Sequence, residues 1–125
     1  MPANYNLVGW FEVPVKDLDR AKKFYEDVFN IQLAEYTLGP LQMAWFPMKE
    51  GAIGAAGALV KGGSYEPSLS GVLVYMTAPD IDGTLERVKE RGGRVLNPKR
   101  SIGEYGFVGH FEDSEGNRIG LHSRV

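Results

Sequence analysis

The sequence contains no cysteine. Disulfides, thiol nucleophiles and cysteine-ligated zinc are therefore excluded, and a reducing compartment fits this composition. Residues 1–6 lack the charged and apolar regions of a signal peptide. No apolar run approaches the roughly 18 residues that a membrane helix needs. We therefore expect a cytoplasmic protein without a membrane partner.

The chain also lacks a strong charge of either sign. Its 14 Lys and Arg residues and 16 Asp and Glu residues leave a formal net charge of -2. No basic stripe is interleaved with aromatic residues, so nucleic acid is not an expected partner. The 125 residues suit one domain spanning 1–125, which is long enough to bury a substantial core.

The first half of the chain reads as strand, helix and three further strands. Residues 8–15 alternate, with Phe11, Val13 and Val15 on one apolar face. Asp17 is a candidate N-cap for a helix that ends near Asn30 and packs on that face. The apolar stripe of this helix comprises Leu18, Ala21, Phe24, Tyr25, Val28 and Phe29. The three predicted strands after it are 31–38, 41–48 and 52–60.

The same order recurs in the second half. A linker rich in Gly, Ser and Pro covers 61–70. Asp80 opens a second helix, about half the chain length after Asp17, and Gly92-Gly93 supplies its C-terminal cap. The strands predicted around this helix are 71–78, 93–97, 107–112 and 118–123. The simplest interpretation is a duplication with modules at about 7–61 and 70–125.

Three segments carry a resemblance to a known family. Residues 11–29, 91–93 and 112–117 resemble the opening helix region, the second helix end and the D-P-[DE]-G-N turn of the vicinal oxygen chelate superfamily. This group includes glyoxalases, bleomycin-resistance proteins and extradiol dioxygenases. Ser114 stands where proline is usual in the turn. The resemblance implies an α+β fold in which two βαβββ modules form an open eight-stranded cup with the helices outside.

Metal enzymes of that family carry ligands on the first and last strands of each module. These positions fall here on Trp10, Leu73, Gly120 and either Gly57 or Ala58. None of these side chains offers the donor atom that zinc, nickel, iron or manganese needs. We therefore expect no metal and no cofactor, and no metal-dependent glyoxalase or dioxygenase activity.

Strand alternation predicts which side chains face the cup. Glu12 and His122 are the candidate catalytic residues. A carboxylate at Glu12 with a raised pKa could act as a general base, whereas a structural reading pairs it with Arg118. His122 fits an acid–base partner or a hydrogen-bond donor, and equally a frayed end of the last strand. The candidate ligand-binding residues are Trp10, Trp45, Leu73, Tyr75, His110 and Arg118.

Three functions are compatible with this pattern. The first is a glyoxalase- or bleomycin-resistance-like protein that binds a small apolar or aromatic molecule in the cup without metal. The alternative is a metal-free isomerase or lyase in which Glu12 and His122 transfer protons. A sensory or interaction module is the third, and the lack of a DNA-binding segment argues against it. We also expect a homodimer, because an open cup leaves strand edges that proteins usually protect.

Overall fold

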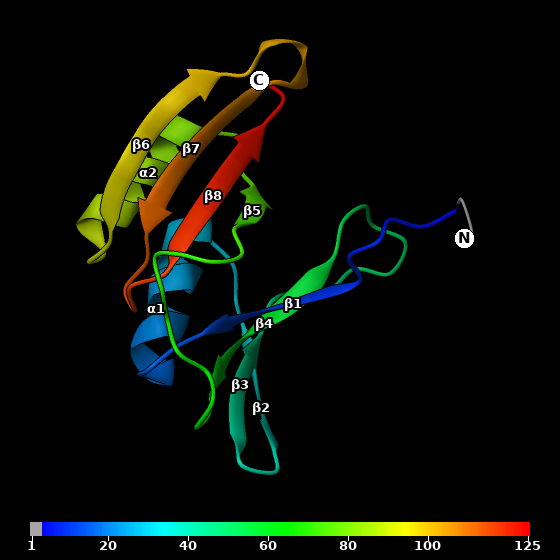
Figure 1. Ribbon diagram of the computed structural model, residues 1–125, viewed down its shortest axis with the longest axis vertical. Coiled ribbons are helices and arrows are strands. Elements are labelled where there is room, and N and C mark those ends of the chain that lie inside the picture. The colour runs from blue at the N-terminus through cyan, green and yellow to red at the C-terminus, as the bar shows by residue number, and fades with distance from the viewer. Residues whose placement is uncertain (1–3) are drawn as a thin grey trace.

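The computed structural model describes residues 4–125 and shows two α-helices and eight strands in that part of the chain (Figure 1). Residues 1–3, part of the segment without a signal-peptide pattern, lie outside the described residues. The elements in chain order are β1 (Trp10–Pro14), α1 (Leu18–Phe29), β2 (Ala34–Leu38), β3 (Leu41–Trp45), β4 (Ala56–Lys61), β5 (Val74–Thr77), α2 (Ile81–Glu90), β6 (Arg94–Ser101), the 3-10 helix η1 (Gly103–Tyr105), β7 (Phe107–Glu112) and β8 (Arg118–Ser123).

Each half of the chain forms its own four-stranded mixed sheet. The strand order is β1-β4-β3-β2 in the first sheet and β5-β8-β7-β6 in the second. In both sheets the first strand of the module runs parallel to the last, and the remaining pairs are antiparallel. The matching order confirms the predicted α+β fold of two βαβββ units. It also places β1 and β5 as edge strands of their sheets.

Both helices begin at the predicted aspartates. The side chain of Asp17 accepts a hydrogen bond from the backbone N–H of Arg20, and that of Asp80 accepts one from Gly83. Such caps satisfy backbone donors that have no partner within the helix. At the end of α2, Gly92 takes a positive φ of 97°, the left-handed conformation that closes many helices.

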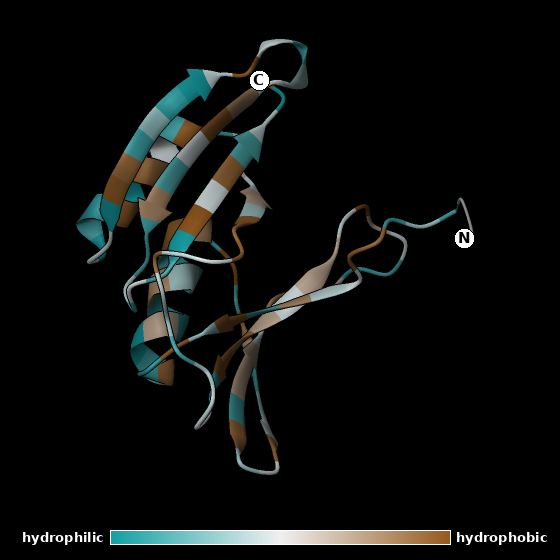
Figure 2. Ribbon diagram, viewed as in Figure 1, coloured by the Kyte–Doolittle hydropathy of each residue, from teal (hydrophilic) through white to brown (hydrophobic). Residues whose placement is uncertain are grey.

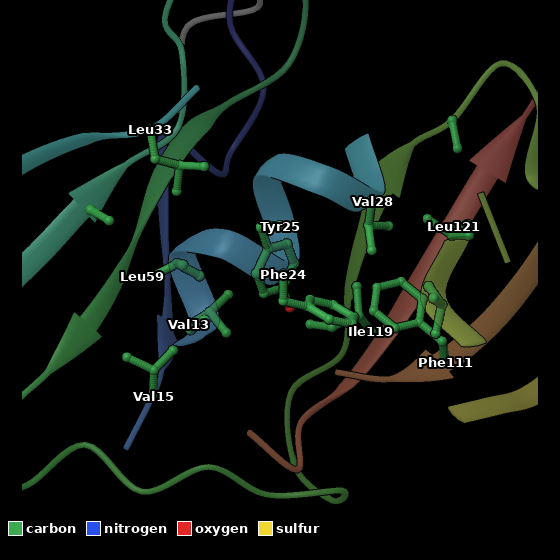
Figure 3. Close-up of a cluster of buried hydrophobic side chains, with 14 of the residues drawn as sticks. Val13, Val15, Phe24, Tyr25, Val28, Leu33, Leu59, Phe111, Ile119 and Leu121 are labelled. Carbon is green, nitrogen blue, oxygen red and sulfur yellow. The ribbon is translucent and has the colours of Figure 1, made fainter. Parts of the chain in front are cut away.

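The main hydrophobic core lies between the two sheets, with α1 at its centre (Figure 3). The ring of Phe24 on α1 lies 6.1 Å, centroid to centroid, from that of Phe111 on β7. Arg87 on α2 donates a hydrogen bond of 2.7 Å to the carbonyl of Val28, which ties the two helices together. The buried residues of α1 are Leu18, Ala21, Phe24, Tyr25 and Val28, as its apolar periodicity predicts. Burying this stripe is the main source of stability for so short a helix.

Most strand boundaries differ from the sequence prediction. The predicted strands 8–15, 31–38, 41–48 and 71–78 are shortened to Trp10–Pro14, Ala34–Leu38, Leu41–Trp45 and Val74–Thr77. Two further differences are larger. The predicted strand 52–60 begins only at Ala56, because Gly51 and Gly54 adopt positive φ angles that belong to turns. The predicted strand 93–97 continues through Pro98 to Ser101. The pairing of β6 with β7 is irregular on both sides of Asn97. Pro98 is tolerated in this strand because β6 lies at the edge of its sheet.

The turn 113–117 fastens the second module to the first. The Glu115 carboxylate accepts hydrogen bonds of 2.9 Å from the backbone N–H groups of Lys16 and Asp17, and one of 2.7 Å from Arg20 Nε. Asn117 donates to the carbonyl of Pro14 at 2.7 Å. The acidic turn is therefore a structural clasp between β7–β8 and the start of α1.

A further hydrogen bond of this clasp is deeply buried. The hydroxyl of Tyr25 donates to the Asp113 carboxylate at 2.6 Å. Burial raises the pKa of Tyr25 well above its usual value, and the neighbouring Asp113 carboxylate raises it further. Burial also raises the pKa of Asp113, although hydrogen bonds from Tyr25 and Asn117 oppose that shift.

Within residues 4–125, neither helix is both long and apolar enough to cross a membrane.

Candidate functional site

An open cleft of about 850 Å³ separates the inner edges of the two modules. One wall is formed by β1 and the segment 53–56, and the other by residues 72–77. Its lining is largely apolar and includes Trp10, Phe11, Phe46, Ile53, Leu73 and Met76. Glu12, Tyr75 and Thr77 add a few polar groups. This size and composition are typical of small-molecule binding sites.

The sequence-predicted residues Trp10 and Glu12 meet on the β1 wall. Glu12 accepts hydrogen bonds from Trp10 Nε1 at 3.3 Å and from the hydroxyl of Tyr65 at 2.7 Å. The hydrogen bond to Glu12 raises the pKa of Tyr65. Glu12 is exposed to solvent rather than buried among apolar side chains. Tyr65 lies in the linker, where no sequence pattern indicates a site residue.

Trp45 belongs to an aromatic group on the face of the first sheet that points away from the main core. Its ring lies 5.2 Å from that of Trp10 and 4.4 Å from that of Tyr36, centroid to centroid. Among the described residues, no hydrogen-bond partner reaches its buried indole nitrogen. Trp45 does not line the cleft, but its ring contacts that of Trp10, which does.

On the second sheet, Tyr75 and His110 form one unit. The Tyr75 hydroxyl lies 2.7 Å from His110 Nε2, and Asn97 Nδ2 lies 3.3 Å from His110 Nδ1. Burial, together with the charges of Arg118 and Arg100, lowers the pKa of His110. Asn97 is a further site residue that sequence analysis missed, because its pairing with His110 depends on the shifted register of β6.

The remaining candidates lie apart from this cleft. Arg118 lines a smaller neighbouring cavity of about 260 Å³ together with Glu12 and Glu66. No ion pair joins Arg118 to Glu12 in the described part of the chain, so the structural pairing considered for Glu12 is made by Tyr65 instead. His122 lines neither cavity, and its Nε2 lies 2.7 Å from the carbonyl oxygen of Tyr105.

The expected single cavity therefore holds Trp10, Glu12 and Tyr75 but not His122. Glu12 belongs to β1 of the first sheet and His122 to β8 of the second. Alternation predicts which face of its own strand a side chain occupies, but it does not fix how the two sheets are oriented. The structure does not bring these two catalytic candidates together.

The positions where relatives of this fold carry metal ligands do not suit a metal here. Ala58 lies on the open face opposite Glu12, and Gly120 lies opposite Tyr75. Neither has a donor atom, and the nearby donors Glu12 and His110 are already hydrogen-bonded. Within residues 4–125 no three His, Asp or Glu side chains come together in a group that could hold a metal ion. A metal of the usual family type does not fit this donor set.

Gly120 instead makes room for the ring of Tyr75. A Cβ atom at this position would lie 2.5 Å from Cδ1 of Tyr75, far closer than real Cβ contacts. The missing side chain thus leaves room for the Tyr75 ring to cross β8 and reach His110. The position Gly120, where metal-binding relatives carry a ligand, is therefore the place where the Tyr75 ring packs against β8.

Comparison with known proteins agrees with this architecture. A glyoxylase-like domain-containing protein of Didymella fabae is 29% identical over 124 residues, covering 96% of this chain and 95% of that protein. The putative glyoxylase CFP32 of Mycobacterium bovis is 28% identical over 117 residues, covering 90% of this chain but only 44% of the mycobacterial protein. A glyoxylase/bleomycin resistance protein/dioxygenase domain from Frankia sp. EAN1pec superposes with a TM-score of 0.73 at 15% identity, covering 96% of this chain and 98% of that one.

The family assignment follows from a model that covers most of the sequence. The model of the Glyoxalase/Bleomycin resistance protein/Dioxygenase superfamily matches residues 7–121, which include both βαβββ units, the cleft residues and the clasp. The chain belongs to the glyoxalase/bleomycin resistance protein/dioxygenase superfamily.

Proposed function

We propose that this protein binds a small apolar or aromatic molecule in the cleft between its modules without using a metal. The cleft itself carries the proposal, since about 850 Å³ of largely apolar lining matches a ligand of drug-like size. Trp10 presents an accessible aromatic surface there, with 37% of the residue exposed. The superfamily to which the chain belongs includes bleomycin resistance proteins.

A metal-free isomerase or lyase is the alternative function. It requires Glu12 and His122 to act on one substrate, yet they belong to different sheets and only Glu12 lines the cleft. Glu12 is held by Trp10 and Tyr65 as a hydrogen-bond acceptor. This arrangement supports ligand binding better than it supports proton transfer between these two residues.

Binding of N-phenyl-1-naphthylamine, a neutral aromatic probe, tests the proposal. In ¹H–¹⁵N NMR spectra, saturable shifts should appear at the Trp10 indole and at the amides of residues 53–56 and 72–77, because these groups line the cleft. With two tryptophans in the chain, the indole signals are easily assigned. Shifts confined to surfaces away from the cleft, or no saturable binding, would contradict the proposed function.

We further propose that the active form is a homodimer. Apolar side chains at the mouth of the cleft are highly exposed, including Ile53 at 100% and Val72 at 93%. Figure 2 shows such apolar positions on the segment before β1 and on the chain leading into β5. Together with the edge strands β1 and β5, they leave a surface that proteins usually cover.

Light scattering should therefore give twice the chain mass at micromolar concentration. Val72→Asp should shift the protein toward the monomer, because a buried carboxylate without a partner opposes association. Lys61→Glu, a charge change on an exposed residue that does not line the cleft, is the control. A monomeric mass for the unmodified protein would rule out the dimer.

A further inference from the structure

A row of side chains crosses the open face of the second sheet. Strand pairing places Tyr75 opposite Gly120, Gly120 opposite His110, and His110 opposite Asn97. All four strands thus contribute one residue to the row, on the face directed away from the main core. The row begins at Tyr75, which also lines the cleft. Tyr75 therefore borders both the cleft and this face.

The hydrogen bonds along the row leave one donor free. Asn97 Nδ2 donates to His110 Nδ1 at 3.3 Å, so the ring proton of neutral His110 is on Nε2. Nε2 then donates to the Tyr75 oxygen at 2.7 Å. The phenolic proton of Tyr75 is not used in this chain of bonds. With 47% of the residue exposed, Tyr75 is available to donate that proton in a hydrogen bond to a ligand.

Two guanidinium groups flank the row. Arg100 pairs with Val108, two residues before His110 on β7, and Arg118 pairs with Glu112, two residues after it. Both arginines are exposed, and the positive charges of both act on His110. Neither forms an ion pair within residues 4–125, whereas Arg94 on the same face is bonded to Glu112 at 2.7 Å.

We propose that this face binds an oxyanion of the ligand, through the Tyr75 hydroxyl and the guanidinium groups of Arg100 and Arg118. The inference builds on the proposed function: the cleft takes the apolar body of the ligand, and the anionic group extends from it past Tyr75. Arginine suits this role because its planar donors match carboxylate, sulfonate and phosphate oxygens. The ligand class is thus an aromatic or apolar organic acid.

A matched pair of fluorescent probes tests the subsite. 1-Anilinonaphthalene-8-sulfonate carries a sulfonate on the same skeleton as neutral N-phenyl-1-naphthylamine. The sulfonate probe should bind more tightly, by roughly tenfold or more, since hydrogen bonds to charged groups stabilise more than neutral ones. Added salt should weaken binding of the sulfonate probe and leave that of the neutral probe nearly unchanged.

Two variants test which side chains cause the preference for the sulfonate probe. Tyr75→Phe keeps the ring on Gly120 but removes the hydroxyl, and Arg118→Gln removes one charge. Each should lower the ratio of sulfonate to neutral affinity roughly 5- to 20-fold. Arg118 does not line the cleft, so Arg118→Gln should also leave neutral binding within about twofold. Lys89→Gln removes the same charge from α2, which covers the opposite face of the second sheet, and should change neither affinity.

The outcomes separate the two proposals. Equal affinity for both probes, or equal losses for both in Tyr75→Phe and Arg118→Gln, would overturn the anion subsite while leaving the apolar cleft intact. Failure of both probes to bind the unmodified protein would overturn the proposed function and the subsite with it. A selective loss of sulfonate binding in both variants, absent from Lys89→Gln, supports the subsite.

Discussion

Replacing Glu115 with Gln should lower the free energy of unfolding by roughly 2–3 kcal/mol at neutral pH, because a buried charged partner is lost from several donors at once. The Glu115 side chain is fully buried, at 0% exposure. It receives two backbone N–H groups and two nitrogens of Arg20. An amide has one acceptor oxygen, so some of these donors would remain unsatisfied.

The pH dependence of this effect has a defined sign. Burial alone would raise the pKa of Glu115, but hydrogen bonds from Arg20, Asp17 and Lys16 outweigh it and lower the pKa from 4.5 to about 2. A folded-state pKa below the unfolded one stabilises the protein fully above pH 4.5, by roughly 3 kcal/mol, and this stabilisation disappears as the pH falls toward 2. The difference between the two proteins should therefore shrink across that window.

Urea unfolding measured at several pH values checks this prediction. Glu86→Gln is the matched control, because Glu86 also forms an ion pair of 2.7 Å, with Lys89, but both partners are exposed. Exposed pairs of this kind contribute about 0–1 kcal/mol. Asp113, whose pKa is shifted the opposite way, is present in both proteins and cancels in the comparison. If Glu115→Gln costs no more than the control, or the cost is independent of pH, the clasp does not fasten the modules as described.

Local sequence patterns were sufficient to predict the modules. Each of the signals used depends only on residues that are close together in the sequence. These signals are the period-two pattern of β1, the apolar stripe of α1 and the two capping aspartates. Each element could therefore be predicted from its own segment. The repetition of the pattern then indicated two βαβββ units, because the same local order recurs in both halves.

The contacts that define the site depend on long-range geometry instead. Tyr65 reaches Glu12 only because the linker folds back across β1, which no local pattern indicates. Asn97 reaches His110 only because the register of β6 shifts between Val95 and Asn97. The orientation of the two sheets, which separates His122 from Glu12, is set by packing around α1. Alternation along a strand carries none of this information.

Trp10→Ala should weaken binding of N-phenyl-1-naphthylamine by about 1–3 kcal/mol, roughly 5- to 150-fold, because it removes a large aromatic surface from the cleft. The cost to folding should be small, about 1 kcal/mol, since Trp10 is partly exposed and its ring contacts Trp45 from the open side. A residue of the main core would instead cost about 3–5 kcal/mol when an aromatic ring is removed.

The most direct test of the account measures probe affinity and unfolding free energy together for Trp10→Ala and Tyr36→Ala. Tyr36 also packs on Trp45 and is 50% exposed, but it does not line the cleft. We predict a large loss of affinity with near-native stability for Trp10→Ala, and nearly unchanged affinity for Tyr36→Ala. If Trp10→Ala instead unfolds the protein while the folded fraction still binds the probe normally, Trp10 is a structural residue and the cleft is not the binding site.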